Sequence, residues 1–311
     1  MPFASASKTP VAIQIKLNND LSAAARNGSV GGLEKALIKG ADPLAALGGE
    51  TPLIAAARYG RIECLKILLP LSDPLASNNQ GFTALQFAAL MGDAAAVELL
   101  LPVSDIARGE RDGITPLMHA VRKNQLDCVR ILSVAADPAQ TDSDGRTALT
   151  HAAMALEIGQ PNTAQSDACA QIMALLVERA GPSVVNAADK NGRTPFATAL
   201  AHEKKHNALA LIPSTDLSAK DPLGFDAFAL AFRMLSVGTN DTGRVVLEAL
   251  CSDPRATEEQ VNRVVHGFSA KERFEMPQAV ARFEAFAIQR ELAANALPSG
   301  QKPARRAARS L

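Results

Sequence analysis

Apolar residues recur along this sequence in short, helix-length stretches with a fixed period. TPLIAAARYG, TALQFAALMG and TPLMHAVRKN all begin at a residue that we call the anchor. Successive anchors are 32 residues apart, except for one interval of 47. A self-similar period of this length is typical of repeat proteins. The anchors of the seven registers are Asn19, Thr51, Thr83, Thr115, Thr147, Thr194 and Asp226.

Each anchor predicts the start of a helix. Asn, Thr and Asp side chains cap a helix by accepting a backbone N–H bond at its N-terminus. Pro52, Pro116 and Pro195 follow their anchors directly, at the first helical position, where no donor is needed. A glycine stands two residues before every anchor except Asn19, and glycine tolerates the positive φ of a tight turn. We therefore expect a turn before each helix.

A second apolar stretch begins about thirteen residues after most anchors. LEKALI, CLKILL, AVELLL, CVRILS, CAQIMALL, ALALI and VVLEAL place apolar residues at i, i+3 and i+4, which gives a helix with one buried stripe. Each unit thus reads as turn, helix, loop, helix. Because neither helix covers its apolar face alone, we expect adjacent units to stack into an α-solenoid.

These features together resemble the ankyrin repeat, over roughly residues 19–253. The resemblance rests on the period, the G-x-T-P-L and T-A-L starts, the A-A-x-x-G helix ends and the A-D-P turn at Asp42 and Pro43. It implies an all-α helical repeat solenoid with short hairpin turns, in about seven repeats, of which the first and last are degenerate. LPLSDP and LPVSD replace the family's G-A-D turn. The family's usual histidine three residues after the anchor is replaced by Ile54, Gln86, Met118, Thr150 and Ala197.

The chain divides into four parts: an N-terminal extension (1–18), the repeat array (19–254), a non-repeat C-terminal helical cap (255–296) and a basic tail (297–311). Thr257 to Gln260 and Ser269 to Glu272 each read as a capping box, and Pro277 opens a further helix. That helix has Val280, Phe283 and Phe286 on one side, so we expect the cap to close the solenoid. A partner-binding helix is the alternative. The tail carries Lys302, Arg305, Arg306 and Arg309.

Two insertions account for the interval of 47 residues. About nine extra residues lie around 157–168 and about six lie in ERAGPSVVN, and we expect both to form surface loops. Loops of this kind often belong to a binding face, but a neutral loop also costs little free energy. The seventh unit has a longer loop, SVGTNDTG, between its helices.

Composition and charge disfavour several classes of function. Lys plus Arg and Asp plus Glu are both 32, so no global charge favours nucleic acid or an anionic membrane. The N-terminus lacks a signal-peptide pattern, and no segment approaches ~18 uninterrupted apolar residues. We expect a cytoplasmic protein that does not bind a membrane.

The residues that could carry chemistry do not form a catalytic or metal-binding pattern. His119 and His151 share a register, but without a third ligand we expect them to pack between helices and hydrogen-bond locally. The cysteines have no CxxC spacing, and we expect small buried side chains rather than disulfides. No GxSxG, HExxH, P-loop or GxGxxG appears. We therefore predict no enzyme activity, cofactor or small-molecule substrate. The cysteines are Cys64, Cys128, Cys169 and Cys251.

The resemblance implies that a partner meets the concave side, formed by the hairpin tips and the exposed end of each first helix. The residues carried over by register include more lysine and arginine than acids, together with aromatic and methionine side chains, so we expect an acidic partner surface around an apolar centre. The helix dipole alone could also account for some of the arginines. The candidates are Glu50, Arg58, Tyr59, Phe82, Leu90, Met91, Arg111, Ile114, Arg122, Lys123, Arg146, Met154, Arg193, His202, Phe225, Arg233 and Met234.

The function predicted from sequence is a non-enzymatic protein–protein interaction module. An inhibitor or immunity-type protein that covers a partner enzyme is an alternative with the same binding face. Nucleic-acid binding through the basic face and tail is a further alternative. The array lacks the aromatic side chains, placed between basic residues, that stack on the bases of single-stranded nucleic acid. The net charge is also zero, so nucleic-acid binding is disfavoured.

Overall fold

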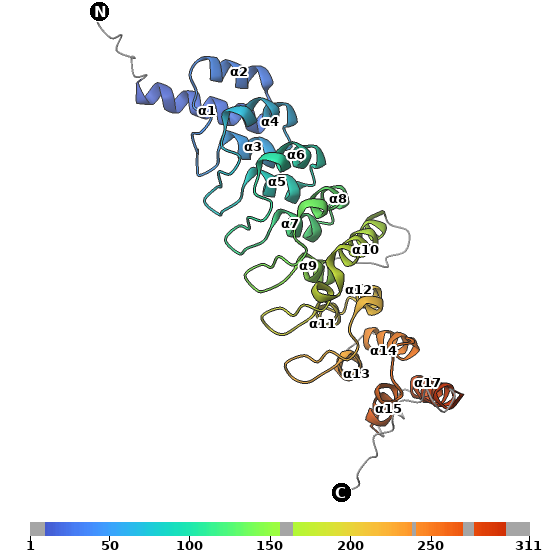
Figure 1. Cartoon of the computed structure of the whole chain (residues 1–311). Helices are drawn as coiled ribbons and strands as arrows, with labels where there is room; N and C mark the ends of the chain where they lie inside the picture. The colour runs from blue at the N-terminus through green and yellow to red at the C-terminus, as the bar shows by residue number, and fades with distance from the viewer. Residues whose placement is uncertain (1–9, 156–163, 238–240, 270–276, 297–311) are drawn as a thin grey trace, which may run out of the picture. The chain divides into compact units, whose positions relative to one another are not determined.

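The chain folds into pairs of antiparallel helices joined by hairpins, as Figure 1 shows. The computed structural model describes residues 10–155, 164–237, 241–269 and 277–296. These residues form two compact units, with the boundary after Asn191. Their secondary structure is helical apart from isolated β-bridges within hairpins, such as Ser77 with Thr83 and Thr141 with Thr147. The all-α repeat fold predicted from sequence is confirmed.

The first unit contains the helices up to residue 185, and its hairpins all project on the same side of the stack (Figure 1). Its helices are α1 (Val11–Asn27), α2 (Val30–Ile38), α3 (Pro52–Arg58), α4 (Ile62–Leu68), η1 (Leu69–Leu71), α5 (Ala84–Met91), α6 (Ala94–Leu100), η2 (Leu101–Val103), α7 (Pro116–Arg122), α8 (Leu126–Ala135), α9 (Ala148–Ala155) and α10 (Ala164–Val185).

The second unit continues the same pattern of helix pairs. Its helices are α11 (Pro195–Ala201), α12 (Lys205–Leu211), η3 (Ile212–Ser214), α13 (Ala227–Val237), α14 (Thr242–Ser252), α15 (Glu258–Gly267) and α17 (Pro277–Ala296).

Six of the seven anchors cap a helix as predicted. The side-chain oxygen of each accepts the backbone N–H of the residue three positions later, at 3.2 to 3.3 Å for the threonines and 2.9 Å for Asp226. The prediction for Asn19 is wrong. Helix α1 already begins at Val11, after Pro10, because no turn-forming glycine interrupts the residues before Asn19. Residues 11–18, which the sequence assigned to an extension, are therefore part of the first helix.

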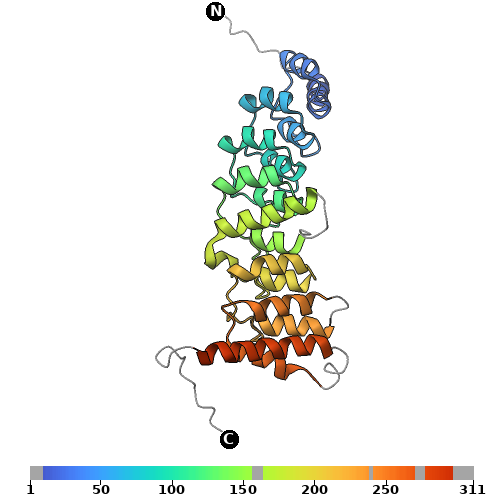
Figure 2. The ribbon, with the colours of Figure 1, turned by 90° about the vertical axis from the view of Figure 1, so that its right-hand side faces the viewer.

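Stacking buries two rows of helices in the first unit. The first helices of successive repeats contact one another in the order α1, α3, α5, α7 and α9, and the second helices in the order α2, α4, α6, α8 and α10. Figure 2 shows the row of second helices in this unit. The first helices are rich in alanine and are buried on most sides, as in Leu53 to Ala57. Small side chains allow the close approach that this stacking requires.

Helix α10 corrects one of the predicted loops. The six extra residues in ERAGPSVVN do not form a loop, because the helix continues to Ala180 and a further turn carries the buried Val184 and Val185. The backbone breaks at Gly181, with φ of 67°, since the residue before a proline avoids the α conformation. The other insertion lies partly outside the described residues, at 156–163.

The same helix is long and apolar enough, by length and composition, to cross a membrane over Ser166–Val185. Its buried residues Ile172 and Met173 belong to the core of the first unit, where α10 contacts α8 and α9. A core helix of a repeat stack has the same composition. The four cysteines are buried, as the sequence predicted.

The C-terminal helices follow the repeat pattern more closely than the sequence suggested. Helix α15 packs on α13 as one first helix packs on the next, and α17 packs on both α14 and α15 as a second helix does. Thr257 caps α15 in the predicted capping box with Gln260. The pair thus takes the place of one more repeat, but without a hairpin before it. The predicted box at Ser269 to Glu272 and the tail 297–311 lie largely or wholly outside the described residues.

Candidate functional site

Several hairpins are held in shape by an Asn or Asp five positions before the anchor. Asn78 Oδ1 accepts the backbone N–H groups of Gln80 and Phe82 at 2.9 and 3.0 Å. Asp142 and Asp221 make the equivalent pairs of bonds at 2.8 to 2.9 Å. A short side-chain acceptor that bonds the backbone two residues on fixes such a turn. The shape of these hairpins is therefore fixed by local hydrogen bonds.

Backbone hydrogen bonds join neighbouring hairpins of the first unit. The Ser143 N–H donates to the Asp112 carbonyl at 2.8 Å, and the Lys190 N–H donates to the Asp144 carbonyl at 2.9 Å. The Arg111 guanidinium donates to the Asn79 carbonyl in a similar position. We use the name hairpin face for the hairpin tips and helix ends of this unit, that is, residues 47–50, 58–59, 79–82, 90–91, 111–114, 122–123, 143–146 and 154.

A row of rings lies beneath the hairpin face. The Phe82 ring stacks on Phe87 at 5.0 Å between centroids and contacts His119 at 5.1 Å. The Arg58 guanidinium lies 5.3 Å from the Phe87 ring centroid and 5.7 Å from that of Tyr59. Cation–π contacts of this kind orient the guanidinium at a partly exposed site. Phe82 is half-buried, so part of its surface is covered within the protein.

Acidic side chains hold two of the arginines of the face. Glu50, whose side chain is 12% exposed, lies 3.4 Å from Arg58 Nη1 and 3.7 Å from Arg26 Nη2. Asp144 lies 2.9 Å from Arg146 Nη1. Exposed pairs contribute little to stability, but they fix the position of side chains that are otherwise flexible. The face therefore presents arginines in defined positions.

The two histidines are buried under the face, each beside a carboxylate. His151 Nε2 lies 2.9 Å from Asp142 Oδ2, and His119 Nε2 lies 3.9 Å from Glu110 Oε1, beyond hydrogen-bond distance. Burial, with Arg122 nearby, lowers the pKa of His119 to about 4, so its ring is neutral near pH 7. Burial also lowers the pKa of His151, although Asp142 opposes the shift.

Sequence reasoning missed these carboxylates, although the signal was present. Glu110 and Asp142 both stand five residues before an anchor, and both histidines stand four residues after one, so the same register brings each pair together. The predicted local hydrogen bond is confirmed for His151. Within the described part of the chain, no group of three or more His, Cys, Asp or Glu side chains is placed to hold a metal ion.

The helices, hairpins and caps described above agree with a comparison against family models. Residues 21–108 and residues 103–166 each match a family model described as ankyrin repeats (3 copies). The chain is an ankyrin repeat protein. Ankyrin repeats generally mediate protein–protein interaction, and the family is typically non-enzymatic. The helix pairs from Pro195 onward lie outside the matched residues but keep the ankyrin order of hairpin, helix and helix. No curated protein matches the chain.

Most candidate residues of the ankyrin array reach solvent, but one does not. Ile114 is only 8% exposed, so the expectation that it faces solvent is wrong. It stands directly before its anchor, at the register of Phe82, which is half-buried. The exposed candidates are Arg58, Tyr59, Met91, Arg111, Arg122, Lys123, Arg193, His202 and Arg233; the half-buried ones are Glu50, Phe82, Leu90, Arg146, Met154, Phe225 and Met234.

The candidates fall into two groups, one in each ankyrin unit. Those from Glu50 to Met154 belong to the hairpin face of the first unit. The other five, from Arg193 to Met234, belong to the second unit, where the Arg233 guanidinium lies 5.5 Å from the Phe225 ring centroid. We therefore treat the two groups as separate surfaces.

Proposed function

We propose that this ankyrin repeat protein binds a protein partner on the hairpin face of its first unit, without catalysing a reaction. The proposal rests on one observation: a row of exposed side chains lies over buried aromatic rings and acidic side chains. Arg58 lies on Phe87 and is paired with Glu50, while Tyr59 and Met91 of the same face are 44% and 49% exposed.

The chemistry of the face favours a partner surface with acidic groups around an apolar centre. Arg122 and Lys123 are exposed at one end of α7, and among the described residues no salt bridge involves them. Fixed arginine and aromatic groups are the residue types that contribute most to binding free energy at interfaces. A rigid face also loses little conformational entropy on association. Binding therefore needs no change in the shape of the array.

A protein partner is favoured over nucleic acid by the pairing of the arginines. Arg58 and Arg146 are already engaged by Glu50 and Asp144, so less positive charge is available for phosphate groups. Affinity for nucleic acid comes mainly from uncompensated lysine and arginine. An inhibitor that covers an enzyme would bind through the same face. Only the identity of the partner distinguishes an inhibitor from other protein-binding modules.

Site-specific photo-crosslinking in the native cell tests the proposal. A photoreactive amino acid replaces Met91 on the hairpin face or, as a matched control, Val134 on the second-helix row; both side chains are well exposed. We expect one discrete protein adduct from position 91 and none from position 134. Adducts of equal yield at both positions, or adducts that disappear on nuclease treatment, contradict the proposal.

A charge reversal on the same face provides a second readout. We expect Arg122→Glu to reduce the yield of the position 91 adduct at least tenfold, since the reversed charge repels an acidic partner. Arg179→Glu, an equally exposed position on α10, is the control and leaves the yield unchanged. Circular dichroism confirms that both variants remain folded.

A further inference from the structure

The last hairpin, residues 218–225, differs from the others because no hairpin follows it. Only residues 253–256 connect α14 to the cap Thr257 of α15. The Arg255 guanidinium fixes this connection by donating to the backbone carbonyls of Ile212 and Thr215 at 2.6 and 3.0 Å. A β-carbon placed on Gly192 would contact Pro222 of the following hairpin. One placed on Gly224 would meet no described atom within 4 Å.

The missing hairpin leaves one face of α13 uncovered. In the complete repeats, the residues three and six positions after the anchor are buried, and Gln86 at the third position donates to the Arg108 carbonyl of the next hairpin at 2.9 Å. At the same positions of the last repeat, Ala229 and Phe232 are only half-buried. The residues buried at these positions in the complete repeats are Ile54, Ala57, Gln86, Ala89, Met118, Val121, Thr150, Ala153, Ala197 and Leu200.

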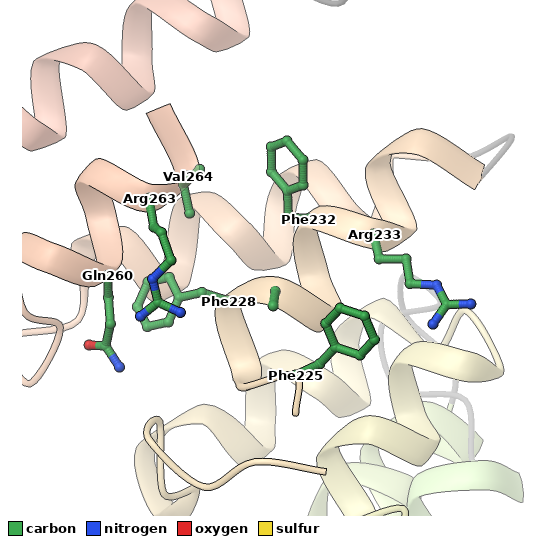
Figure 3. Close-up of a pocket in the computed structure, with 8 residues that line it drawn as sticks. Phe225, Phe228, Phe232, Arg233, Gln260, Arg263 and Val264 are labelled. Atoms are coloured by element: carbon green, nitrogen blue, oxygen red, sulfur yellow. The ribbon is translucent and has the colours of Figure 1, made fainter. Parts of the chain in front are cut away.

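The uncovered face forms a pocket of about 380 Å³ between α13 and α15. Phe225, Phe228 and Phe232 line it from the last repeat and Val264 from α15, and Figure 3 shows Arg263 and Arg233 on either side of the rings. A volume of this size is within the range of protein ligand pockets, about 300 to 1,000 Å³. The pocket has room for a large apolar side chain.

The groups around the mouth of the pocket indicate which chemistry it binds. Arg233 is exposed and lies over the Phe225 ring, and among the described residues it has no acidic partner. Arg263 is half-exposed and already pairs with the buried Asp226 at 2.9 Å. An acidic group on a ligand would therefore find an unpaired guanidinium at Arg233. The pocket combines an apolar interior with one available positive charge.

The backbone beside the pocket also offers an acceptor. In the first unit, the carbonyls of Asp112 and Asp144, three residues before their anchors, accept an N–H from the next hairpin. The carbonyl at the same register of the last hairpin is that of Leu223, whose side chain is 73% exposed. No hydrogen bond to this carbonyl occurs within the described ranges. A polypeptide backbone in the place of a hairpin could donate to it.

We propose that this pocket binds an extended segment of a partner protein in the place of the missing hairpin. A large apolar side chain of the segment enters between Phe232 and Val264, an adjacent aspartate or glutamate pairs with Arg233, and a backbone N–H of the segment donates to the Leu223 carbonyl. Addition of an extended strand to an open edge is a recurring mode of peptide recognition. The chain's own tail is a poor occupant because it is basic.

This site lies in the second unit and is separate from the hairpin face, so either proposal can fail without the other. A phage-displayed library of eight-residue peptides, selected on the full-length chain, tests it. We expect the enriched peptides to share a large apolar residue next to an acid. Their affinities are then measured by fluorescence anisotropy for the wild-type chain and for two pocket variants.

The variants change the charge and the volume of the pocket independently. We expect Arg233→Glu to weaken binding about tenfold by removing one ion pair, and Ala229→Phe to weaken it at least as much by filling the pocket. Arg179→Glu in the first unit is the matched control and leaves the affinity unchanged. Circular dichroism checks the fold of each variant.

Three results overturn the proposal. The first is a selection that enriches no peptide, and the second is an enrichment without acidic residues. The third is binding that is equally tight to Ala229→Phe and to the wild-type chain, which places the peptide elsewhere and leaves Phe232 as a packing residue of the terminal helices.

Discussion

The repeat that begins at Thr115 and the repeat that begins at Asp226 have the same parts but different surroundings. Both anchors cap a helix, and in both hairpins the last backbone carbonyl accepts an N–H bond from the residue four positions earlier. In the Thr115 repeat, Met118 and Val121 are 1% and 0% exposed, whereas the equivalent Ala229 and Phe232 are half-buried. The difference shows that the next hairpin, rather than the helix itself, completes the burial of each first helix.

Truncating two phenylalanines of α13 gives the largest effect and sharpens this comparison. Phe228 is 2% exposed, so Phe228→Ala leaves a cavity and costs about 4 kcal/mol of unfolding free energy. Phe232 is one turn later on the open side, and we expect Phe232→Ala to cost about 1 to 2 kcal/mol, because part of its surface already faces water. Urea unfolding monitored by circular dichroism measures both. Equal losses of unfolding free energy would show that this side of α13 is buried as completely as the same side of the other first helices.

Lowering the pH should destabilise the covered repeat through His119. The pKa of this residue is lowered from 6.5 to about 4 in the folded chain, first by burial and then by Arg122, His151 and Lys123. Between these values the unfolded chain takes up the proton and the folded chain does not. Stability therefore falls as the pH falls from 6.5 toward 4, by about 1.4 kcal/mol per pH unit and about 3 kcal/mol in all.

Neighbouring groups modify this dependence without reversing its sign. The lowered pKa of His151 acts in the same direction, while burial raises the pKa of Glu110, which opposes the loss near the lower end of the range. Urea titrations at several pH values on the wild-type chain and on His119→Gln measure the contribution of this ring. We expect the slope of the unfolding free energy against pH to decrease in the variant. An unchanged slope would contradict the assignment of the pH dependence to His119.

A pair of glycine substitutions gives the smallest effect and tests the hairpin contacts directly. Gly113 and Gly224 both have positive φ, of 75° and 84°, so alanine at either position costs about 1 kcal/mol of backbone strain. At Gly113 the added β-carbon would also lie 3.0 Å from the Ser143 nitrogen of the next hairpin, whereas at Gly224 it meets no described atom. We expect Gly113→Ala to cost about twice as much as Gly224→Ala in thermal unfolding. A larger loss at Gly224 would show that the last hairpin is covered.

Most of the repeat fold could be predicted from local signals in the sequence. Anchors from Thr51 to Asp226 start helices because a capping side chain, a preceding glycine and an apolar period agree at each of them. Where one signal was absent, the prediction failed: Asn19 has no glycine before it, and helix α1 runs through it. In ERAGPSVVN the glycine and proline predicted a loop, but the structure has a break at Gly181 followed by a further helical turn, in which Val184 and Val185 are buried.

The candidate surface depended more on contacts between repeats. The register placed Arg58, Tyr59 and Arg122 at exposed positions, as the structure shows. It could not show that Ile114 is buried, or that Phe82 contacts His119, which belongs to the next repeat. Partner binding by these residues stays a prediction.

The sequence by itself determined the repeating unit, because caps, turns and helix periodicity act within about thirty residues. Only the tertiary structure decided which faces of those units are covered. Helices α15 and α17 continue the stack without a hairpin, so the pocket at Phe232 exists because a neighbour is missing. Burial depends on what packs against a residue, and in a stack of similar repeats that neighbour lies one repeat away along the chain.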